Sequence, residues 1–280
     1  MARDLLPLVK KALEGRYVIE REIGRGGAAR VFQGVDPAGT RVAVKVLHPQ
    51  LSATVTAERF LREIKVISRL EHPNIARLID FGEREWLLWY VMEYLEGPTL
   101  KQHLTRVRRA SVSDTVRIAH DLLSALSAAH AIAFVHRDVK PDNIVLTPHG
   151  ASLVDFGIAK AVAESTTDRL TRSGFAVGTS AYMSPEQIAG ADVIDARSDL
   201  YSLACVLFEC LAGRPPFDDP HDETVLARHQ SAPVPELQSL RPDTPPPLVQ
   251  AITRALGKQP DERWPTAEAM RAALPSLAPA

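Results

Sequence analysis

The sequence predicts an α+β fold of two lobes, a small β-rich N-terminal lobe with one main helix and a larger helical C-terminal lobe. The chain has 280 residues, which at roughly 150 residues per domain favours two folded units or one large bilobal unit. Strand patterns dominate up to about residue 95, and helical periodicity dominates beyond it. We therefore expect one large bilobal domain at 17–275, with lobes at about 17–95 and 96–275. An N-terminal extension at 1–16, which contains a short surface helix, and a tail at 276–280 would flank it.

The N-terminal lobe is expected to be a sheet with one helix. Runs rich in β-branched and aromatic residues, bounded by turn residues, indicate strands. These runs cover residues 17–23, 30–35, 41–47, 75–83 and 86–95. Between the third and fourth runs, residues 56–70 carry apolar side chains at helical spacing, which are Phe60, Ile64, Ile67 and Leu70. A helix is therefore expected there, ending before Pro73, because proline disfavours a helical residue before it.

The C-terminal lobe is expected to be built around two long helices. Residues 113–131 have the pattern of an amphipathic helix, whereas residues 198–211 are apolar nearly all round. The second pattern is typical of a helix buried at the centre of a domain. Gly97 and Pro98 mark a hinge-like break before this lobe. A proline-rich loop and two shorter helices are expected at 233–247, 248–256 and 266–274.

The composition argues against several classes of protein. An apolar content of 45% can fill a core, which excludes wholesale disorder. A count of 33 Lys and Arg against 34 Asp and Glu argues against nucleic acid or an acidic membrane as the main partner. The longest apolar run, residues 86–92, is far shorter than the roughly 20 residues of a membrane span, and Asp4 interrupts any secretory signal. Two cysteines, Cys205 and Cys210, form neither a disulfide framework nor a metal motif, which favours a reducing compartment.

A glycine-rich segment lies between the first two expected strands. It reads Ile23-Gly24-Arg25-Gly26-Gly27-Ala28-Ala29-Arg30-Val31. Glycines allow backbone N–H groups to approach phosphates closely, although the segment taken alone is more simply explained as a hairpin turn. A dinucleotide-binding fingerprint is excluded because the segment leads into a strand, and no Walker A lysine follows it.

Lys45 and Glu63 are two charged residues at positions where apolar residues are expected. Lys45 lies in the strand RVAVKVL, whose two faces are otherwise apolar, and a buried ammonium group needs a partner. Glu63 lies beside the apolar stripe of the next helix and could provide that partner. The alternative is that both side chains extend to solvent, as most lysines and glutamates do.

The segment with the strongest chemical signal is Val135-His136-Arg137-Asp138-Val139-Lys140-Pro141-Asp142-Asn143-Ile144-Val145-Leu146. A second carboxylate, Asp155, follows twelve positions after Asn143 in Val154-Asp155-Phe156-Gly157. One carboxylate near a nucleophile can take its proton. An aspartate and an asparagine carbonyl oxygen can hold Mg²⁺ on a triphosphate.

Together, these motifs resemble the eukaryotic-type Ser/Thr protein kinases, particularly their bacterial members, from about Tyr17 to Met270. The matching positions are the glycine-rich segment, Lys45 in VAVK, Glu63, the loop HRDVKPDN, Asp155 in DFG, Gly178-Thr179, Ser184-Pro185-Glu186, the helix start at Arg197, and Arg263. The resemblance implies a bilobal protein-kinase-like fold in which Arg263 pairs with Glu186. Two positions depart from the family pattern, since Ala29 replaces the third glycine and Ser184 replaces an alanine. Neither change removes a catalytic group.

The resemblance also implies the roles of individual residues. Asp138 would accept or orient the proton of the substrate hydroxyl, and Lys140 would contact the γ-phosphate. Lys140, together with Thr179 in the segment that receives the acceptor, would indicate Ser/Thr rather than Tyr specificity. Lys45, positioned by Glu63, would hold the α- and β-phosphates. Asn143 and Asp155 would hold two Mg²⁺ ions, which Mn²⁺ could replace. The full set expected to bind ATP is Ile23, Gly24, Arg25, Gly26, Gly27, Val31, Ala43, Lys45, Met92, Glu93, Leu95, Val145 and Asp155.

Within this set, Val31, Ala43 and Val145 would enclose the adenine, and Met92 would be the gatekeeper. The backbone of Glu93 and Leu95 would form the hinge hydrogen bonds. Ordinary core packing is the alternative explanation for Met92 and Val145.

The function predicted from this resemblance is ATP-dependent phosphorylation of Ser and Thr hydroxyls in proteins. Two alternatives are a pseudokinase scaffold and a small-molecule phosphotransferase. The first is disfavoured because Lys45, Asp138, Asn143 and Asp155 are all present. The second is disfavoured because that group generally lacks the Gly178-Thr179 and Ser184-Pro185-Glu186 segment.

Regulation and cellular setting follow from the same resemblance. Thr171 and Ser173 occupy positions similar to the phosphorylated pair of bacterial relatives, and Arg137 would bind the phosphate. The alternative is that these hydroxyls belong to a solvated loop without a regulatory role. We expect a cytoplasmic kinase with protein substrates and no nucleic acid partner, either soluble or the cytosolic part of a longer membrane receptor. The resemblance leaves a homodimer open.

Overall fold

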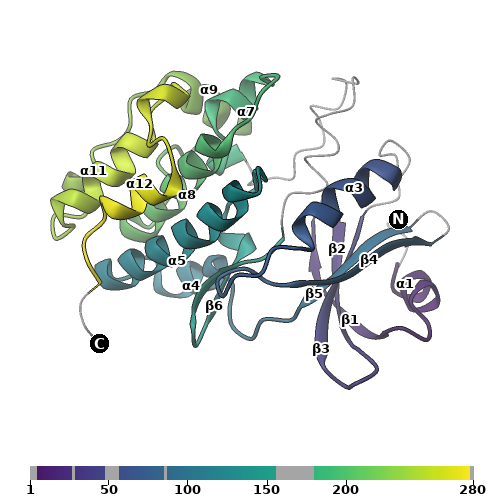
Figure 1. The fold of residues 1–280 in the computed structure, drawn as a ribbon. Helices are drawn as coiled ribbons and strands as arrows, with labels where there is room; N and C mark the ends of the chain where they lie inside the picture. Colours follow the sequence, from purple (N-terminus) through teal and green to yellow (C-terminus); the bar gives the residue numbers. More distant parts are fainter. Residues whose placement is uncertain (1–4, 27–28, 48–56, 85–86, 156–179, 278–280) are drawn as a thin grey trace. The chain divides into compact units, whose positions relative to one another are not determined.

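The computed structural model describes residues 5–26, 29–47, 57–84, 87–155 and 180–277. These residues form two compact units (Figure 1). Unit 1 holds the described residues up to Glu71 together with Ala76–Leu95. Unit 2 holds His72–Ile75 and the described residues from Glu96 onward.

The described part of unit 1 is an antiparallel sheet with two helices. Its elements are α1 (Leu6–Ala12), β1 (Val18–Arg25), β2 (Ala29–Val35), β3 (Arg41–Leu47), α3 (Ala57–Ile67), β4 (Leu78–Arg84) and β5 (Leu87–Glu93). The five strands are hydrogen-bonded in the order β1-β2-β3-β5-β4, with antiparallel pairs throughout. The strands and the helix expected from the sequence are therefore confirmed, with ends that differ by a few residues. The β-rich N-terminal part of the expected α+β fold is confirmed in the same way.

The register of the sheet separates two sets of side chains. Lys45 on β3 pairs with Val31 on β2 and Tyr90 on β5, and Ala43 pairs with Met92. Because side chains alternate along a strand, these residues share one face, and their neighbours in sequence share the other. We call the face that carries Val31, Ala43, Lys45, Tyr90 and Met92 the lysine face.

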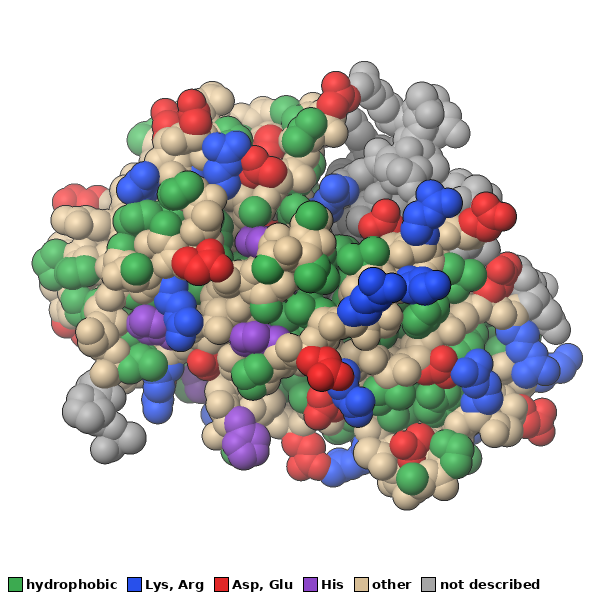
Figure 2. All heavy atoms as spheres, viewed as in Figure 1, with side chains coloured by type: hydrophobic (Ala, Val, Ile, Leu, Met, Phe, Trp, Pro, Cys, Tyr) green, Lys and Arg blue, Asp and Glu red, His purple; other side chains and the backbone are tan. Residues whose placement is uncertain are grey.

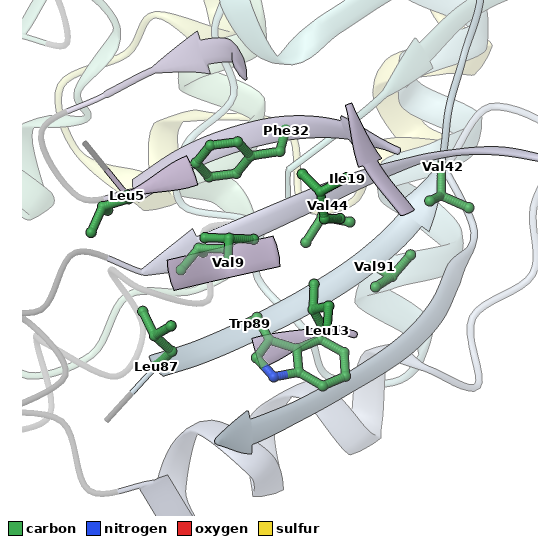
Figure 3. Close-up of a cluster of buried hydrophobic side chains, with 11 residues drawn as sticks. Leu5, Val9, Leu13, Ile19, Phe32, Val42, Val44, Leu87, Trp89 and Val91 are labelled. Carbon is green, nitrogen blue, oxygen red and sulfur yellow. The ribbon is translucent and has the colours of Figure 1, made fainter. Parts of the chain in front are cut away.

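Helix α1 covers the opposite face of the sheet. Leu5, Val9 and Leu13 on one side of this helical segment are almost fully buried. Figure 3 shows them packed with side chains of β1, β2, β3 and β5, which are Ile19, Phe32, Val42, Val44, Leu87, Trp89 and Val91. A proline at the start of α1, where its missing N–H costs nothing, favours the helix. The predicted N-terminal helix is therefore present, and one side of it belongs to the core of unit 1.

Polar contacts fix the end of α1 to the sheet. Arg84 donates a hydrogen bond to the carbonyl oxygen of Ala12 at 2.9 Å. Arg16 forms an ion pair with Asp80 at 2.6 Å, and the hydroxyl of Tyr17 donates to the same carboxylate at 3.0 Å. Burial, together with the negative charge of Asp80, raises the pKa of Tyr17 to about 12. The segment that links α1 to β1 is therefore held to β4 through Ala12, Arg16 and Tyr17.

A Val9→Asp substitution tests the contribution of α1 to stability. Val9 is only 1% exposed, so the change places a carboxylate in an apolar contact and removes a burial worth about 1.5–3 kcal/mol. We expect a lower midpoint in chemical denaturation and a red-shifted emission from Trp89. The matched control is Lys10→Asp, which adds the same group on the exposed side of α1. Equal stability of the two variants would show that the packing of α1 contributes little.

Unit 2 is mainly helical. Its elements are α4 (Leu100–Val107), α5 (Val112–Ala131), the 3₁₀ turn Pro141–Asn143, β6 (Ile144–Thr147), β7 (Gly150–Leu153), the 3₁₀ turn Ser180–Tyr182, α7 (Pro185–Ala189), α8 (Ala196–Ala212), α9 (Asp222–Ser231), α10 (Leu237–Leu240), α11 (Pro246–Ala255), the 3₁₀ turn Pro260–Glu262 and α12 (Ala267–Ala272). Strands β6 and β7 form a two-stranded antiparallel sheet.

Helix α8 is the centre of unit 2, as its sequence predicts. Every residue from Ser198 to Ala212 is buried, including Cys205 and Cys210. The carboxylate of Asp195 caps its first turn by accepting the Arg197 N–H at 2.8 Å. The helix ends at Gly213, whose φ of +82° suits glycine.

Four helices of the described residues differ from the expectations. The sequence analysis expects no helix at α4, α7 or α9, and α10 lies inside the segment expected to be a proline-rich loop. Helix α10 has only four residues and an exposed N-terminal cap without a side-chain hydrogen bond, so its local signal is weak. Among the described residues, no helix is both long and apolar enough to cross a membrane.

Candidate active site

The described residues of the glycine-rich segment lie at the paired ends of β1 and β2, which are antiparallel. Gly24 lies opposite Val31, and the N–H of Gly26 donates to the carbonyl oxygen of Ala29 at 2.9 Å. Ile23 and Arg25, on either side of Gly24, are exposed at the end of β1. Gly27 lies outside the described residues. A plain turn and a phosphate-binding loop would both join the two strands in this way, so the phosphate-binding role stays a prediction.

The predicted nucleotide residues of unit 1 share the lysine face. Val31 and Tyr90 lie on either side of Lys45 in neighbouring strands, and Met92 lies opposite Ala43. Ala43 and Met92 are buried, whereas Lys45 is half-buried. An ammonium group thus lies beside apolar side chains, which is a suitable surface for an aromatic base with a phosphate tail.

Lys45 and helix α3 contact the same aromatic ring. The Nζ atom of Lys45 lies 5.9 Å from the centroid of Tyr90, and the ring of Phe60 on α3 lies 6.5 Å from it. Phe60, Ile64, Ile67 and Leu70 are buried, as the stripe predicts. Glu63 is half-buried on the same helix. Its ion pair with Lys45 stays a prediction.

The end of β5 presents backbone groups for a hinge. The N–H of Glu93 donates to the carbonyl oxygen of Arg77 at 2.9 Å, so Glu93 would offer its carbonyl oxygen to a base. Leu95, half-buried, is the last described residue of unit 1. The N–H of Leu95 would be the second hinge group.

In unit 2, the loop after α5 brings Asp138, Lys140 and Asn143 together. The Nζ atom of Lys140 lies 3.0 Å from Oδ2 of Asp138. The side-chain amide of Asn143 donates to the same oxygen at 2.9 Å and to the backbone carbonyl of Asp138 at 2.8 Å. The carboxylate of Asp138 is therefore oriented by two donors from its own loop. The side chain of Asp138 keeps 11% exposure and that of Lys140 keeps 19%.

A fully buried carboxylate on α8 holds the backbone of this loop. Asp199 accepts the N–H of His136 and the N–H of Arg137, both at 2.8 Å. The Nε2 atom of His130 at the end of α5 also lies 2.8 Å from Asp199. These contacts satisfy a charge that would otherwise be costly to bury. Asp199 lies at the start of the apolar segment 198–211, and a carboxylate in such a helix is a signal for an anchor of this kind.

Two site residues have left-handed backbone conformations. Arg137 has a φ of +63° and Asp155 a φ of +65°. For residues with a Cβ this conformation costs about 1–3 kcal/mol and is concentrated at functional sites. The contacts made by Asp199 hold Arg137 in this conformation.

Asn143 and Asp155 are close in the fold. The N–H of Val154, which precedes Asp155, donates to the carbonyl oxygen of Asn143 at 2.9 Å. Asn143 uses its amide nitrogen on Asp138, so its side-chain carbonyl oxygen is the atom type that suits Mg²⁺. One amide and one carboxylate fit Mg²⁺, which usually binds one or two protein oxygens together with phosphates and water. In the described part of the chain, no cluster of three or more acidic, histidine or cysteine residues forms a closed metal site.

The expected pairing of Arg263 with Glu186 is confirmed. Both guanidinium nitrogens Nη1 and Nη2 lie 2.7 Å from the two carboxylate oxygens of Glu186. Arg263 also donates to the carbonyl oxygens of Gly257 at 2.8 Å and Arg197 at 3.1 Å. Ser198 donates to Glu186 from α8. This bidentate pair joins α7, α8 and the turn before α12.

The remaining predicted residues are only partly described. Val145 on β6 is buried in unit 2 and forms a bridge with Thr99. Thr171, Ser173, Gly178 and Thr179 lie outside the described residues. Their predicted roles in regulation and substrate binding stay predictions.

Comparison with known proteins agrees with this geometry. The family model described as the protein kinase domain matches residues 17–274. The serine/threonine-protein kinase pkn3 of Myxococcus xanthus is 40% identical over 281 residues, which cover 96% of this chain and 51% of that protein. PrkC of Bacillus subtilis, a serine/threonine-protein kinase, is 37% identical over 268 residues, which cover 95% of this chain and 41% of that protein.

A probable serine/threonine-protein kinase PknB of Lactococcus lactis is 36% identical over 266 residues, covering 94% of this chain and 42% of that protein. The chain thus spans about half or less of the length of these curated relatives. The family model, in contrast, covers nearly all of the chain, and the loop that it aligns holds Asp138 and Asn143 in contact. On this match and this geometry, the chain belongs to the protein kinase domain family.

Proposed function

We propose that this chain transfers the γ-phosphoryl group of ATP to serine and threonine hydroxyls of proteins. The observation that carries the proposal is the orientation of the Asp138 carboxylate by Lys140 and Asn143 in a loop anchored on buried Asp199. The printed names of the similar proteins, all serine/threonine-protein kinases, support the same reaction.

The residues of each unit have separate tasks in this reaction. Asp138 receives or orients the proton of the acceptor hydroxyl, and Lys140 contacts the γ-phosphate. Lys45 on the lysine face holds the α- and β-phosphates, with Glu63 of α3 as its positioning partner. The apolar neighbours Val31, Ala43 and Met92 contact the adenine.

Asn143 and Asp155 would hold Mg²⁺, and Mn²⁺ would suit the same oxygen donors. The metal supplies positive charge that neutralises the transferred phosphoryl group. The contact between Val154 and Asn143 keeps the two donor residues near each other. The proposal that Asn143 and Asp155 hold Mg²⁺ therefore rests on their oxygen donors and on this one backbone hydrogen bond.

The proposed partners are protein acceptors in the cytosol. On the face shown in Figure 2, Lys and Arg side chains of the described residues are interspersed with Asp and Glu, as the net charge of −1 suggests. Such a mixed surface favours varied protein partners over a polyanion. Both Cys205 and Cys210 are buried free cysteines, which suits a reducing compartment.

The test is incubation of the purified chain with Mg·ATP labelled at the γ-phosphate and a generic protein acceptor, followed by phosphoamino-acid analysis. We expect label on phosphoserine and phosphothreonine only. Nucleotide binding without any transfer would favour a pseudokinase. Transfer to a small-molecule acceptor but not to protein would favour a small-molecule phosphotransferase.

We also propose that the chain phosphorylates itself on Thr171 and Ser173 and gains activity by doing so. A phosphate adds about −1.5 to −2 charges and three acceptor oxygens, which a guanidinium such as that of Arg137 can bind with two hydrogen bonds. The position of Arg137 beside Asp138 links such a contact to the catalytic loop. Phosphate on a solvated loop without any effect on the rate is the alternative.

For this regulation, we expect loop phosphate by mass spectrometry in the wild type. The Thr171→Ala/Ser173→Ala double variant should have a lower rate on an external acceptor, because Arg137 then lacks its anionic partner. Phosphatase treatment should lower the wild-type rate to the same level. A fully active enzyme without loop phosphate would contradict the proposal.

A further inference from the structure

The backbone of Arg137 is held at both ends by side chains from other elements. Its N–H donates to Asp199 on α8 at 2.8 Å. Its carbonyl oxygen accepts a hydrogen bond from the side-chain amide of Gln187 on α7 at 2.9 Å. Arg137 has a left-handed conformation, so both ends need partners to keep it there.

The carbonyl group of Arg137 and the N–H of Asp138 belong to the same rigid peptide plane. The Asp138 N–H contacts Nδ1 of His136 at 3.3 Å, which is a long hydrogen bond. The shorter bond from Gln187 therefore has the stronger hold on this plane. Rotation of the plane would change the direction in which the Asp138 side chain leaves the backbone.

Gln187 uses the two ends of its amide for different purposes. Its Oε1 atom accepts the backbone N–H of Ser184 at 3.1 Å and faces the Ser184 hydroxyl at 3.2 Å, which completes the capping box of α7. Its Nε2 atom donates to Arg137. A glutamate would serve the cap equally well, but only an amide can also donate to the catalytic loop.

We propose that Gln187 is a positioning residue for phosphoryl transfer, which sets the orientation of Asp138 through the Arg137 carbonyl group. The inference rests on the proposed kinase function and concerns the same site. It assigns a role in catalysis to the residue that follows Ser184-Pro185-Glu186, which the sequence motifs alone did not include.

The test is the Gln187→Glu variant, which keeps the size of the side chain and the acceptor for the α7 cap. It replaces the donor to Arg137 with a carboxylate oxygen that faces a carbonyl oxygen. We expect kcat to fall roughly 10- to 100-fold, the scale of a misplaced catalytic group. KM for ATP should stay near the wild-type value, because the variant leaves the lysine face of unit 1 intact. Because the variant keeps the cap of α7 but loses the hydrogen bond to Arg137, its melting temperature should fall less than that of a variant that loses both.

The chain offers a matched control in α4. Thr99 and Gln102 form the same capping box, with the Thr99 N–H donating to Gln102 at 2.9 Å and the Gln102 N–H to Thr99 at 3.1 Å. Gln102→Glu makes the same chemical change in a capping box whose hydrogen bonds join Gln102 to Thr99 rather than to the backbone of the catalytic loop. Its kcat should equal that of the wild type.

A second variant, Gln187→Ala, removes both functions and should lower kcat and melting temperature together. The proposal is overturned if Gln187→Glu retains wild-type kcat, or if its kcat falls only in proportion to lost folded protein. A wild-type chain without any phosphoryl transfer would instead overturn the proposed function, and with it the role of Gln187. If the wild type is active and Gln187→Glu has the same kcat, the role of Gln187 is overturned and the proposed function is not.

Discussion

An Asp138→Asn variant is expected to fold and bind ATP but to lose about 10²- to 10⁴-fold in kcat, the usual contribution of a general base. Asparagine has nearly the same shape as aspartate, so the contacts to Lys140 and Asn143 do not require a rearranged loop. An amide, however, cannot accept the proton of the substrate hydroxyl. The loss should therefore appear in the chemical step rather than in nucleotide affinity.

The measurement is single-turnover transfer from Mg·ATP at saturating acceptor, with ATP affinity determined separately by calorimetry. Asp142→Asn is the matched control, because Asp142 is exposed in the same loop and its replacement by asparagine removes the same charge. That control should keep most of the wild-type rate. Wild-type turnover in purified Asp138→Asn would remove Asp138 from the mechanism.

The sheet of unit 1 could be predicted from the sequence because its pattern is local. Strand β3 alternates Val42, Val44 and Val46 with Ala43 and Lys45, and the observed strand begins and ends where this pattern does. Helix α3 likewise buries the stripe that its spacing predicts. A period of two or of 3.6 residues can be recognised in one short window.

The contacts that organise the catalytic loop could not be predicted in this way. Asp199 lies 62 residues from Arg137 in the sequence, and Gln187 lies 50 residues away. Nothing in a local pattern states which backbone group a distant side chain will contact. The left-handed conformation of Arg137 is also contrary to the local preference of a residue with a Cβ, so it depends on these tertiary contacts.

Helix α1 shows the same limit in an apolar contact. Its sequence indicates a helix with one apolar side, but the spacing of Leu5, Val9 and Leu13 does not state which surface that side will cover. The structure places it on the face of Trp89 and Val91, behind the lysine face. The family model begins at residue 17, so the match to the family does not include this contact.

The largest stability effect is expected from Arg263→Met. Arg263 is completely buried, and its removal leaves Glu186, whose side chain is 11% exposed, without its bidentate partner. Removal of one member of a buried ion pair typically costs about 3–5 kcal/mol. We expect this loss of unfolding free energy in urea denaturation at pH 7. Arg117→Met is the control, since the exposed pair of Arg117 with Asp114 should contribute less than about 1 kcal/mol.

The pH dependence of Arg263→Met tests the cause of that loss. Burial raises the pKa of Glu186, but the hydrogen bonds and charge of Arg263 outweigh burial and hold it below its ordinary value of 4.5. In the wild type, the pair therefore stabilises the fold above that value, and this stabilisation is lost as the pH falls through the lower pKa of the folded state. In Arg263→Met, the hydrogen bond from Ser198 still opposes burial but the larger contribution of Arg263 is gone, so the pKa of Glu186 rises and its charge is lost at higher pH than in the wild type. The stability difference between the two proteins should consequently shrink as the pH falls from 7 toward 4.5, and adding Glu186→Gln to Arg263→Met should recover part of the loss at pH 7. A difference that is independent of pH would mean that lost packing around Arg263, rather than the buried charge of Glu186, causes the destabilisation.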